Sequence, residues 1–289
     1  MPSNKLRPYF LIAPVSILLL SIMSVGLFNA LLSSLGYLPQ LGLTHITFDY
    51  YKEIFRDEIF LKSLRFSLKT SFISTVISVM IGVLISYFLC KNKFSKLRNS
   101  IIKLPVIIPH IVVILLMTTV FSQTGIISRF LYSLGFINDS SSFPLLLSDN
   151  RGIGIILVYL WKGIPFTVIT TYNILTNVND SLENVAINLG ASKWQSFRYI
   201  ALPLAMPSII SSFIILFAFS FGSYEVPFLI GPTTPKALPV LAYVSYISSN
   251  IDQKIISMVL NVILSCVSIV LLLIYNKIFN KINKYKYRR

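Results

Sequence analysis

Six long apolar runs constrain the fold of this chain more than any other feature of its sequence. About 20 consecutive apolar residues span the hydrocarbon core of a bilayer, and each run approaches or exceeds that length. Only 12% of the 289 residues are charged and the mean hydropathy is +0.76, whereas soluble domains carry about 25% charged residues. The sequence therefore predicts an all-α polytopic membrane protein in which residues 1–289 form a single transmembrane domain. The predicted spans are approximately 9–32, 70–90, 104–121, 152–172, 204–221 and 255–276.

The net charge of +15 is distributed in a way that predicts how these spans are oriented. Of the 25 Lys and Arg residues, 15 fall in the two termini and in the second and fourth connections, whereas eight of the ten acidic residues fall in the other three connections. Basic residues concentrate in cytoplasmic loops, so we expect a multi-pass protein of the cell membrane with both termini cytoplasmic. The lipid bilayer and membrane topology account for the basic charge, and we expect no nucleic-acid partner.

The chain has few residues of the types that bind metals or act as nucleophiles. The chain has two cysteines and two histidines, far apart in sequence, and no metal-ligand or nucleophile constellation can be assembled from them. It also lacks the G-x-x-x-x-G-K-[ST] loop that binds nucleotide phosphates. We therefore expect no catalytic residue, no metal and no cofactor bound by this chain.

One connection, between the fourth and fifth predicted spans, carries an organised helical pattern. Asp180 followed three residues later by Glu183 is a capping-box arrangement that begins a helix. Gly190 is placed where a left-handed residue commonly ends one. Between them, apolar residues recur at helical spacing and predict one apolar face. These residues are Leu182, Val185, Ala186 and Leu189.

A second short helix follows in the same connection. Ser192 and Gln195 form another capping box, and Pro203 fits the first turn of the next span, where its missing N–H costs little. The apolar face of the first helix needs to be covered. It could pack on the protein's own helix ends or lie in a groove of a cytoplasmic partner, and the pattern alone leaves both open.

This connection resembles the signature of permease subunits of binding-protein-dependent ATP-binding-cassette (ABC) importers. That signature reads E-A-A, three residues, G, nine residues, I-x-L-P, and often continues as L-G-A-S and L-P-x-x-x-P. The chain carries Leu189-Gly190-Ala191-Ser192 and then Ile200-Ala201-Leu202-Pro203 with Pro207 at the family's spacing. It departs at the front, where Asn184-Val185-Ala186 stands for E-A-A and Glu183 lies one residue early.

The resemblance implies a type I ABC importer permease fold, with six spans and a cytoplasmic two-helix coupling element that docks into a cleft of the ATPase. It implies three protein partners: an ABC ATPase dimer that holds ATP and Mg²⁺, a second permease that is homologous or identical, and an extracytoplasmic solute-binding protein. The residues that the resemblance assigns to ATPase coupling are Asp180, Glu183, Asn184, Val185, Ala186, Leu189, Gly190, Ala191, Ser192 and Pro203.

The fourth predicted span contains a charge near its middle. Lys162 lies eleven residues after Arg151, about 16 Å along a helix, where a charged side chain is costly and is usually functional or paired. Trp161 precedes it, and Pro165 leaves an acceptor free and predicts a bend. Trp161 and Lys162 are therefore candidates for lining the translocation path. The alternative is a lysine satisfied by neighbouring carbonyls at a packing interface.

The segment after the fifth predicted span is apolar but rich in Gly and Pro, which makes a continuous helix between Gly222 and Pro239 implausible. Tyr224 and Glu225 lie at its start, where they could meet the substrate or the delivering protein, or simply cap a helix end. The segment is similar to the permease subgroup of polyamine, iron, sulfate, thiamine and phosphonate importers, and most of all to spermidine and putrescine permeases. An acidic residue at the pore mouth would suit a polyamine.

Two other classes of function remain as alternatives. A secondary transporter driven by an ion gradient favours acidic residues inside the spans, and the predicted spans contain none. A membrane scaffold without transport activity requires no ATPase partner.

Overall fold

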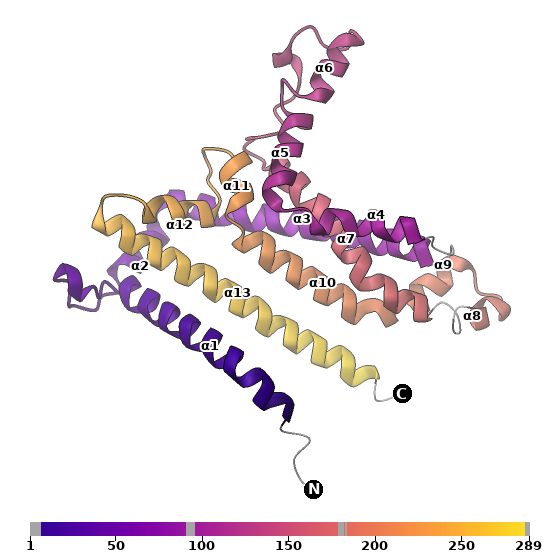
Figure 1. Cartoon of the computed structure of the whole chain (residues 1–289), viewed down its shortest axis with the longest axis horizontal. Coiled ribbons are helices and arrows are strands. Elements are labelled where there is room, and N and C mark those ends of the chain that lie inside the picture. Colours follow the sequence, from indigo (N-terminus) through magenta and orange to yellow (C-terminus); the bar gives the residue numbers. More distant parts are fainter. Residues whose placement is uncertain (1–6, 91–95, 179–181, 183, 287–289) are drawn as a thin grey trace. The chain divides into compact units, whose positions relative to one another are not determined.

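The computed structural model describes residues 7–90, 96–178, 182 and 184–286, and helices account for most of them. The long helices are α1 (Arg7–Ser34), α3 (Glu58–Cys90), α7 (Ile153–Val178), α10 (Leu202–Gly222) and α13 (Ile251–Lys286) (Figure 1). The shorter helices are α2 (Asp49–Arg56), α4 (Lys96–Ile107), α5 (His110–Phe121), α6 (Ile126–Ser133), α8 (Asn184–Asn188), α9 (Lys193–Ser196), α11 (Glu225–Ile230) and α12 (Leu238–Tyr246).

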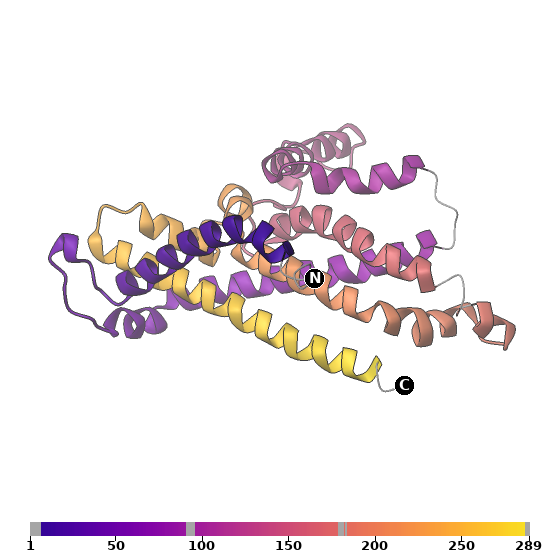
Figure 2. The same ribbon diagram turned by 60° about the horizontal axis from the view of Figure 1, so that its bottom comes forward.

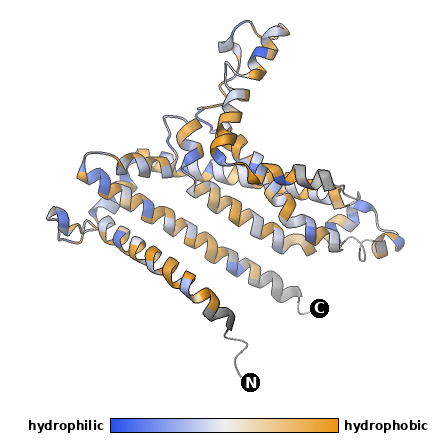
Figure 3. Ribbon diagram, in the orientation of Figure 1, coloured by the Kyte–Doolittle hydropathy of each residue, from blue (hydrophilic) through white to orange (hydrophobic). Residues whose placement is uncertain are grey.

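The prediction of six membrane spans is confirmed for the described residues. Each predicted run overlaps a segment that is long and apolar enough to cross a bilayer, the third run through residues 110–121 only. Apolar residues cover most of the length of these helices, and α1, α10 and α13 show this most clearly (Figure 3). The six segments are Leu11–Ser34, Glu58–Cys90, His110–Ser133, Ile153–Thr176, Lys193–Gly222 and Ile251–Ile274.

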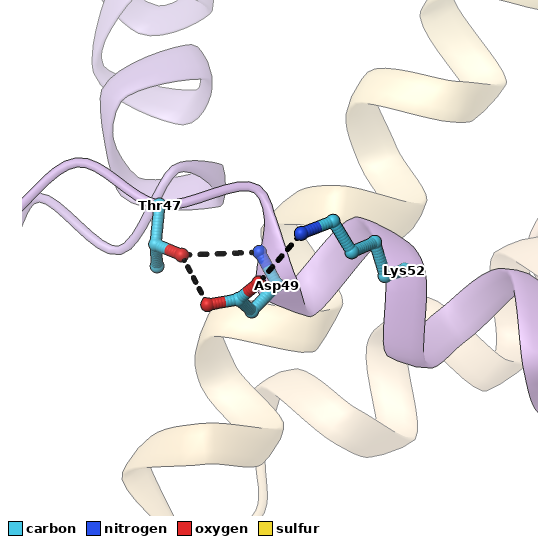
Figure 4. Close-up of polar contacts among 3 residues, drawn as sticks. All are labelled: Thr47, Asp49 and Lys52. Atoms are coloured by element: carbon cyan, nitrogen blue, oxygen red, sulfur yellow. Dashed lines mark hydrogen bonds and ion pairs between the residues drawn. The ribbon is translucent and has the colours of Figure 1, made fainter.

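The contacts divide the chain into two compact units. One contains residues 1–61 and 241–266, and the other contains residues 62–240 and 267–289. In the first unit, α2 begins with a polar cap in which the Thr47 hydroxyl donates to Asp49 at 2.7 Å and Lys52 donates to the same carboxylate at 3.0 Å (Figure 4). Both bonds lower the pKa of the exposed Asp49 carboxyl, and the bond from Thr47 has the larger effect.

The second unit holds most of the long helices. Within it α7 lies beside α10, and α4 runs alongside α7 (Figures 1 and 2). Helices α3 and α7 approach closely because small residues face each other, as is common between membrane helices. A Cβ on Gly163 would lie 2.5 Å from the Ser78 hydroxyl, and one on Gly82 would lie 2.5 Å from Cβ of Thr167.

The third predicted span differs from expectation, because the run 104–121 is not one helix. Helix α4 ends at Ile107, and Pro109 is the N-cap of α5. Proline cannot donate a backbone hydrogen bond, and its ring disfavours the helical conformation of the preceding residue. The chain therefore breaks at Ile108, whereas Pro105 and Pro165 are accommodated inside α4 and α7.

The prediction that no continuous helix follows the fifth span is also confirmed. Helix α10 ends at Gly222, and the next helix along the chain is the short α11. Helix α11 was not predicted from the sequence. Its residues Val226, Pro227 and Ile230 are buried, so the apolar character of this segment reflects packing of a short helix between two breaks.

Candidate functional site

The connection between the fourth and fifth spans forms two short helices, α8 and α9, which we call the α8–α9 element (residues 184–196). Asp180 and Glu183, the predicted first capping box, lie outside the described residues. Helix α8 begins at Asn184. The apolar face predicted for it is uncovered by the described residues, since the exposed fraction is 50% for Leu182, 55% for Val185 and 84% for Leu189. Only Ala186 is half-buried.

Gly190 ends α8 in the predicted left-handed conformation, with φ of 94°. Its N–H donates to the carbonyl of Ile187 at 2.9 Å, and the N–H of Ala191 donates to that of Ala186 at 3.0 Å. This pair of bonds is the Schellman arrangement, which satisfies the last carbonyls of a helix. Gly190 therefore fixes the direction in which the chain leaves α8.

Helix α9 begins with the predicted capping box. The Ser192 N–H donates to the Gln195 side chain at 2.8 Å, and the Gln195 N–H donates to the Ser192 hydroxyl at 3.2 Å. A π-helical turn over Phe197–Ala201 then leads without a break into α10, where Pro203 occupies the first turn. The π turn was not predicted. The Pro203 ring clashes with the carbonyl four residues earlier, and a wider turn relieves that clash.

The second half of the element is anchored to the spans. The side chain of Phe197 is only 4% exposed. The centroid of its ring lies 4.2 Å from the ring centroid of Tyr87 on α3. The Tyr87 hydroxyl donates to the carbonyl of Lys193 at 3.1 Å. Sequence reasoning did not identify Tyr87, because nothing in its local pattern distinguishes it from other apolar positions of α3. The element thus presents α8 outward and holds α9 against α3.

A second polar site lies within the spans, around Lys162 of α7. The Lys162 ammonium donates to the carbonyl of Ile108 at 2.8 Å and lies 3.3 Å from Nδ1 of His110. The Ile108 carbonyl can accept this bond because the break at Pro109 removes it from the helical hydrogen-bond ladder: the N–H groups of Val112 and Val113 donate to Pro109 instead.

Lys162 and Glu225 were predicted separately, and in the structure the helix that Glu225 begins packs against α5 and α7. Glu225 begins α11 at an exposed position, and its charge acts on Lys162 and His110 from a distance, since no ion pair joins it to Lys162 in the described part of the chain. The His110 ring stacks on Phe219 of α10, with 5.0 Å between ring centroids. Sequence reasoning gave His110 no role. Its position directly after Pro109 could have indicated a role, because a proline break inside a span leaves backbone carbonyl groups without helical hydrogen bonds.

The other two candidates for the translocation path lie apart from this site. Trp161 is 37% exposed and does not line the cavity beside Lys162. Tyr224 is half-buried and stacks on Phe228, with 4.9 Å between ring centroids.

A cavity of about 30 Å³ lies beside the Lys162 ammonium. We call it the Lys162 pocket. Among the described residues, the buried hydroxyl of Thr75 has no hydrogen-bond partner, and Thr75 faces this pocket from α3. The polar side chains that line it are Ser74, Thr75, Ser78, His110, Tyr159, Lys162 and Ser220.

Comparison with protein families matches residues 78–284 to the family described as "Binding-protein-dependent transport system inner membrane component". The match begins within α3 and ends within α13, so it includes both the α8–α9 element and the Lys162 pocket apart from Ser74 and Thr75.

Several transport-system permease proteins are similar in sequence. A molybdate/tungstate transport system permease protein of Methanocaldococcus jannaschii is 29% identical over 201 residues, which are 68% of this chain and 74% of that protein. Its counterpart in Pyrococcus abyssi is 32% identical over 188 residues, 64% of this chain and 66% of that protein. A probable sulfate transport system permease protein of Marchantia polymorpha is 27% identical, covering 62% and 59% of the two chains. These names do not support the polyamine prediction.

Solved structures share the fold. A chain of a bacterial alginate ABC transporter, crystallised with an alginate-bound periplasmic protein, superposes with a TM-score of 0.78 at 21% identity and covers 96% of this chain and 94% of that one. A chain of the MetNI methionine ABC transporter superposes with a TM-score of 0.55 at 18% identity, covering 77% and 95%. The predicted type I importer permease fold is therefore confirmed.

Proposed function

The chain belongs to the family of binding-protein-dependent transport system inner membrane components, and we propose that it forms half of the translocation pore of an ABC importer for tetrahedral oxyanions. It is an integral membrane permease of such an importer, and ATP hydrolysis belongs to a separate ATPase subunit. The family match over residues 78–284 carries this proposal.

The substrate class rests on two lines of support. Relatives from two archaea and a plant are named for molybdate, tungstate or sulfate, all of them doubly charged tetrahedral oxyanions. In addition, the one charge placed deep in the fourth span is the cation Lys162, which favours an anion over a polyamine because like charges repel at this depth. Sulfate was among the alternatives considered from the sequence, and it stays within this class.

The α8–α9 element couples the pore to the ATPase. Leu182, Val185 and Leu189 project an apolar face that suits a groove on a partner, and Gly190 sets the angle between this face and α9. The anchoring of α9 by Tyr87 and Phe197 gives a path from the docked helix to α3 and, through the π turn, to α10. Asp180 precedes the docking face in the sequence and Glu183 lies within it, and the two supply its negative charge.

The assembly needs further partners. A second permease, homologous or identical, completes the pore, and an extracytoplasmic solute-binding protein delivers the anion. The distribution of Lys and Arg supports a cytoplasmic position for both termini and for the α8–α9 element. The six spans act in it as one permease domain.

The coupling role is tested by a charge placed on the docking face. Leu189→Asp should abolish co-purification of an ABC ATPase with the tagged chain in mild detergent, because a carboxylate would be desolvated in an apolar groove. Leu134→Asp, at a leucine 54% exposed near the end of α6, is the matched control and should retain the ATPase. If the wild-type chain brings no ATPase from cells that express its neighbouring genes, the scaffold alternative replaces the importer.

The substrate class is tested by uptake into proteoliposomes that contain the complete transporter and its binding protein. ATP-dependent accumulation of radiolabelled sulfate or molybdate should occur, with competition by tungstate and none by spermidine. Uptake of labelled spermidine with no oxyanion uptake would overturn the substrate class and leave the permease assignment intact.

A further inference from the structure

We propose that the Lys162 pocket is an oxyanion subsite of the translocation path, in which the Lys162 ammonium and the Thr75 hydroxyl donate hydrogen bonds to the passing anion. The proposal rests on the proposed function, since it takes oxyanions as the substrate class. It adds that this chain itself binds the anion, separately from the protein that delivers it.

The first support is the supply of donors. A fully ionised sulfate or molybdate can only accept hydrogen bonds, so its subsite needs donors and positive charge. The lysine ammonium carries three donors, and its contacts with Ile108 and His110 engage two of them. Hydrogen bonds between ionised partners are roughly twice as strong as neutral ones. Lys162 therefore holds the capacity to bind an anion while it remains attached to α5.

The second support is the unpartnered hydroxyl of Thr75. This side chain is 2% exposed, and its oxygen has no hydrogen-bond partner among the described residues. A buried polar group without a partner destabilises the folded state, so such a group in a native protein calls for an explanation. Thr75 lies on α3 and Lys162 on α7, and both line the same cavity. An acceptor placed between them would satisfy both.

The size of the pocket defines when the anion can enter. A cavity of about 30 Å³ holds roughly two water molecules, which is too little for a tetrahedral oxyanion. Close packing fixes α3 against α7 at Gly82 and Gly163, whereas the contact that Lys162 makes with α5 consists of exchangeable polar bonds. The anion therefore enters when α5 moves away from α7, and it takes the place of the Ile108 carbonyl at the Lys162 ammonium.

Glu225 has the opposite effect to Lys162 in this scheme. Its carboxylate is exposed and does not line the pocket, and its negative charge acts on Lys162 from outside the pocket. An oxyanion bound at the Lys162 ammonium is repelled by this carboxylate because the two carry charge of the same sign. Removing the charge of Glu225 should therefore strengthen anion binding, whereas removing the charge of Lys162 should weaken it. A purely structural role for the two residues does not predict opposite signs.

The test is equilibrium binding of ³⁵S-sulfate to the complete transporter in lipid nanodiscs without its binding protein, with molybdate as competitor. Lys162→Met should raise the Kd at least tenfold, since a hydrogen bond to a charged group contributes about 1.5–3 kcal/mol. Thr75→Val, which keeps the side-chain shape, should raise it about threefold. Glu225→Gln should lower it. Two matched controls should leave the Kd unchanged. Lys69→Met removes an exposed lysine of α3. Ser86→Ala removes another buried hydroxyl of α3 that has no hydrogen-bond partner among the described residues and lies outside the pocket.

The outcomes separate this inference from the proposed function. A wild-type transporter that imports sulfate but binds none without its binding protein overturns the subsite and leaves the function intact. So does unchanged binding in Lys162→Met, or equal weakening in Lys162→Met and Glu225→Gln. Each variant is first shown to be folded by its elution as an assembled transporter. If Lys162→Met fails this check, the other two variants decide: Thr75→Val should raise the Kd for sulfate and Glu225→Gln should lower it. If the transporter imports spermidine and no oxyanion, the proposed oxyanion substrate class is overturned, and the subsite with it.

Discussion

Gly190 shows how a single residue sets the geometry of a docking surface. Its φ of 94° is readily available only to glycine, because a Cβ in the left-handed region costs roughly 1–2 kcal/mol. Within the described part of the chain, no atom beyond its sequence neighbours lies within 4 Å of the position that a Cβ would take. A substitution by alanine therefore acts through the backbone angle and not through a clash.

We expect Gly190→Ala to reduce both ATPase retention and transport-coupled ATP hydrolysis, because strain at this position turns α8 relative to α9. Gly42→Ala is the matched control: Gly42 also has a positive φ, of 76°, with open space around the Cβ position, but lies far from the element in sequence. The measurement is the amount of co-purified ATPase and its rate of hydrolysis. Equal losses in the two variants would show that strain in general, and not the angle at α8, is responsible.

At the scale of the elements, the break between α4 and α5 supplies the acceptor for Lys162. Pro105 and Pro109 make a natural comparison, because Pro105 lies inside the continuous helix α4 and Pro109 separates α4 from α5. Only Pro109 frees a carbonyl that a charged side chain then uses.

We expect Pro109→Ala to lower the initial rate of solute uptake several-fold. An alanine permits a continuous helix in which the Ile108 carbonyl bonds to the N–H of Val112, so Lys162 loses its acceptor inside the membrane. Pro105→Ala should change uptake little, since the helix already passes through that position. Uptake by the two variants in proteoliposomes, at equal transporter content, is the measurement. An unaltered rate in Pro109→Ala would show that the break does not hold Lys162 in a functional position.

For the whole molecule, patterns with a strong local cause were predicted correctly from the sequence. The apolar runs, the left-handed Gly190 and the Ser192 capping box each follow from a few neighbouring residues. The break at Pro109 was missed because apolar character continues through it, and the run was assigned by hydropathy alone. The convergence of Lys162, His110 and Glu225 joins residues 52 and 63 positions apart in the sequence, and no local pattern connects them. Such a site requires the packing of α5, α7 and α11 to be known.

The orientation of the whole chain in the membrane is the remaining prediction, and the asymmetry of Lys and Arg carries it. In a Cys90→Ser, Cys266→Ser background, single cysteines are introduced as Asn188→Cys in α8 and Ser141→Cys in the connection after α6, both at exposed positions. A membrane-impermeant maleimide added to intact cells should label the variant at 141 and not the one at 188, and permeabilised cells should label both. Because the α8–α9 element can reach an ATPase only from the cytoplasm, labelling of position 188 in intact cells would contradict both the orientation and the coupling role of that element.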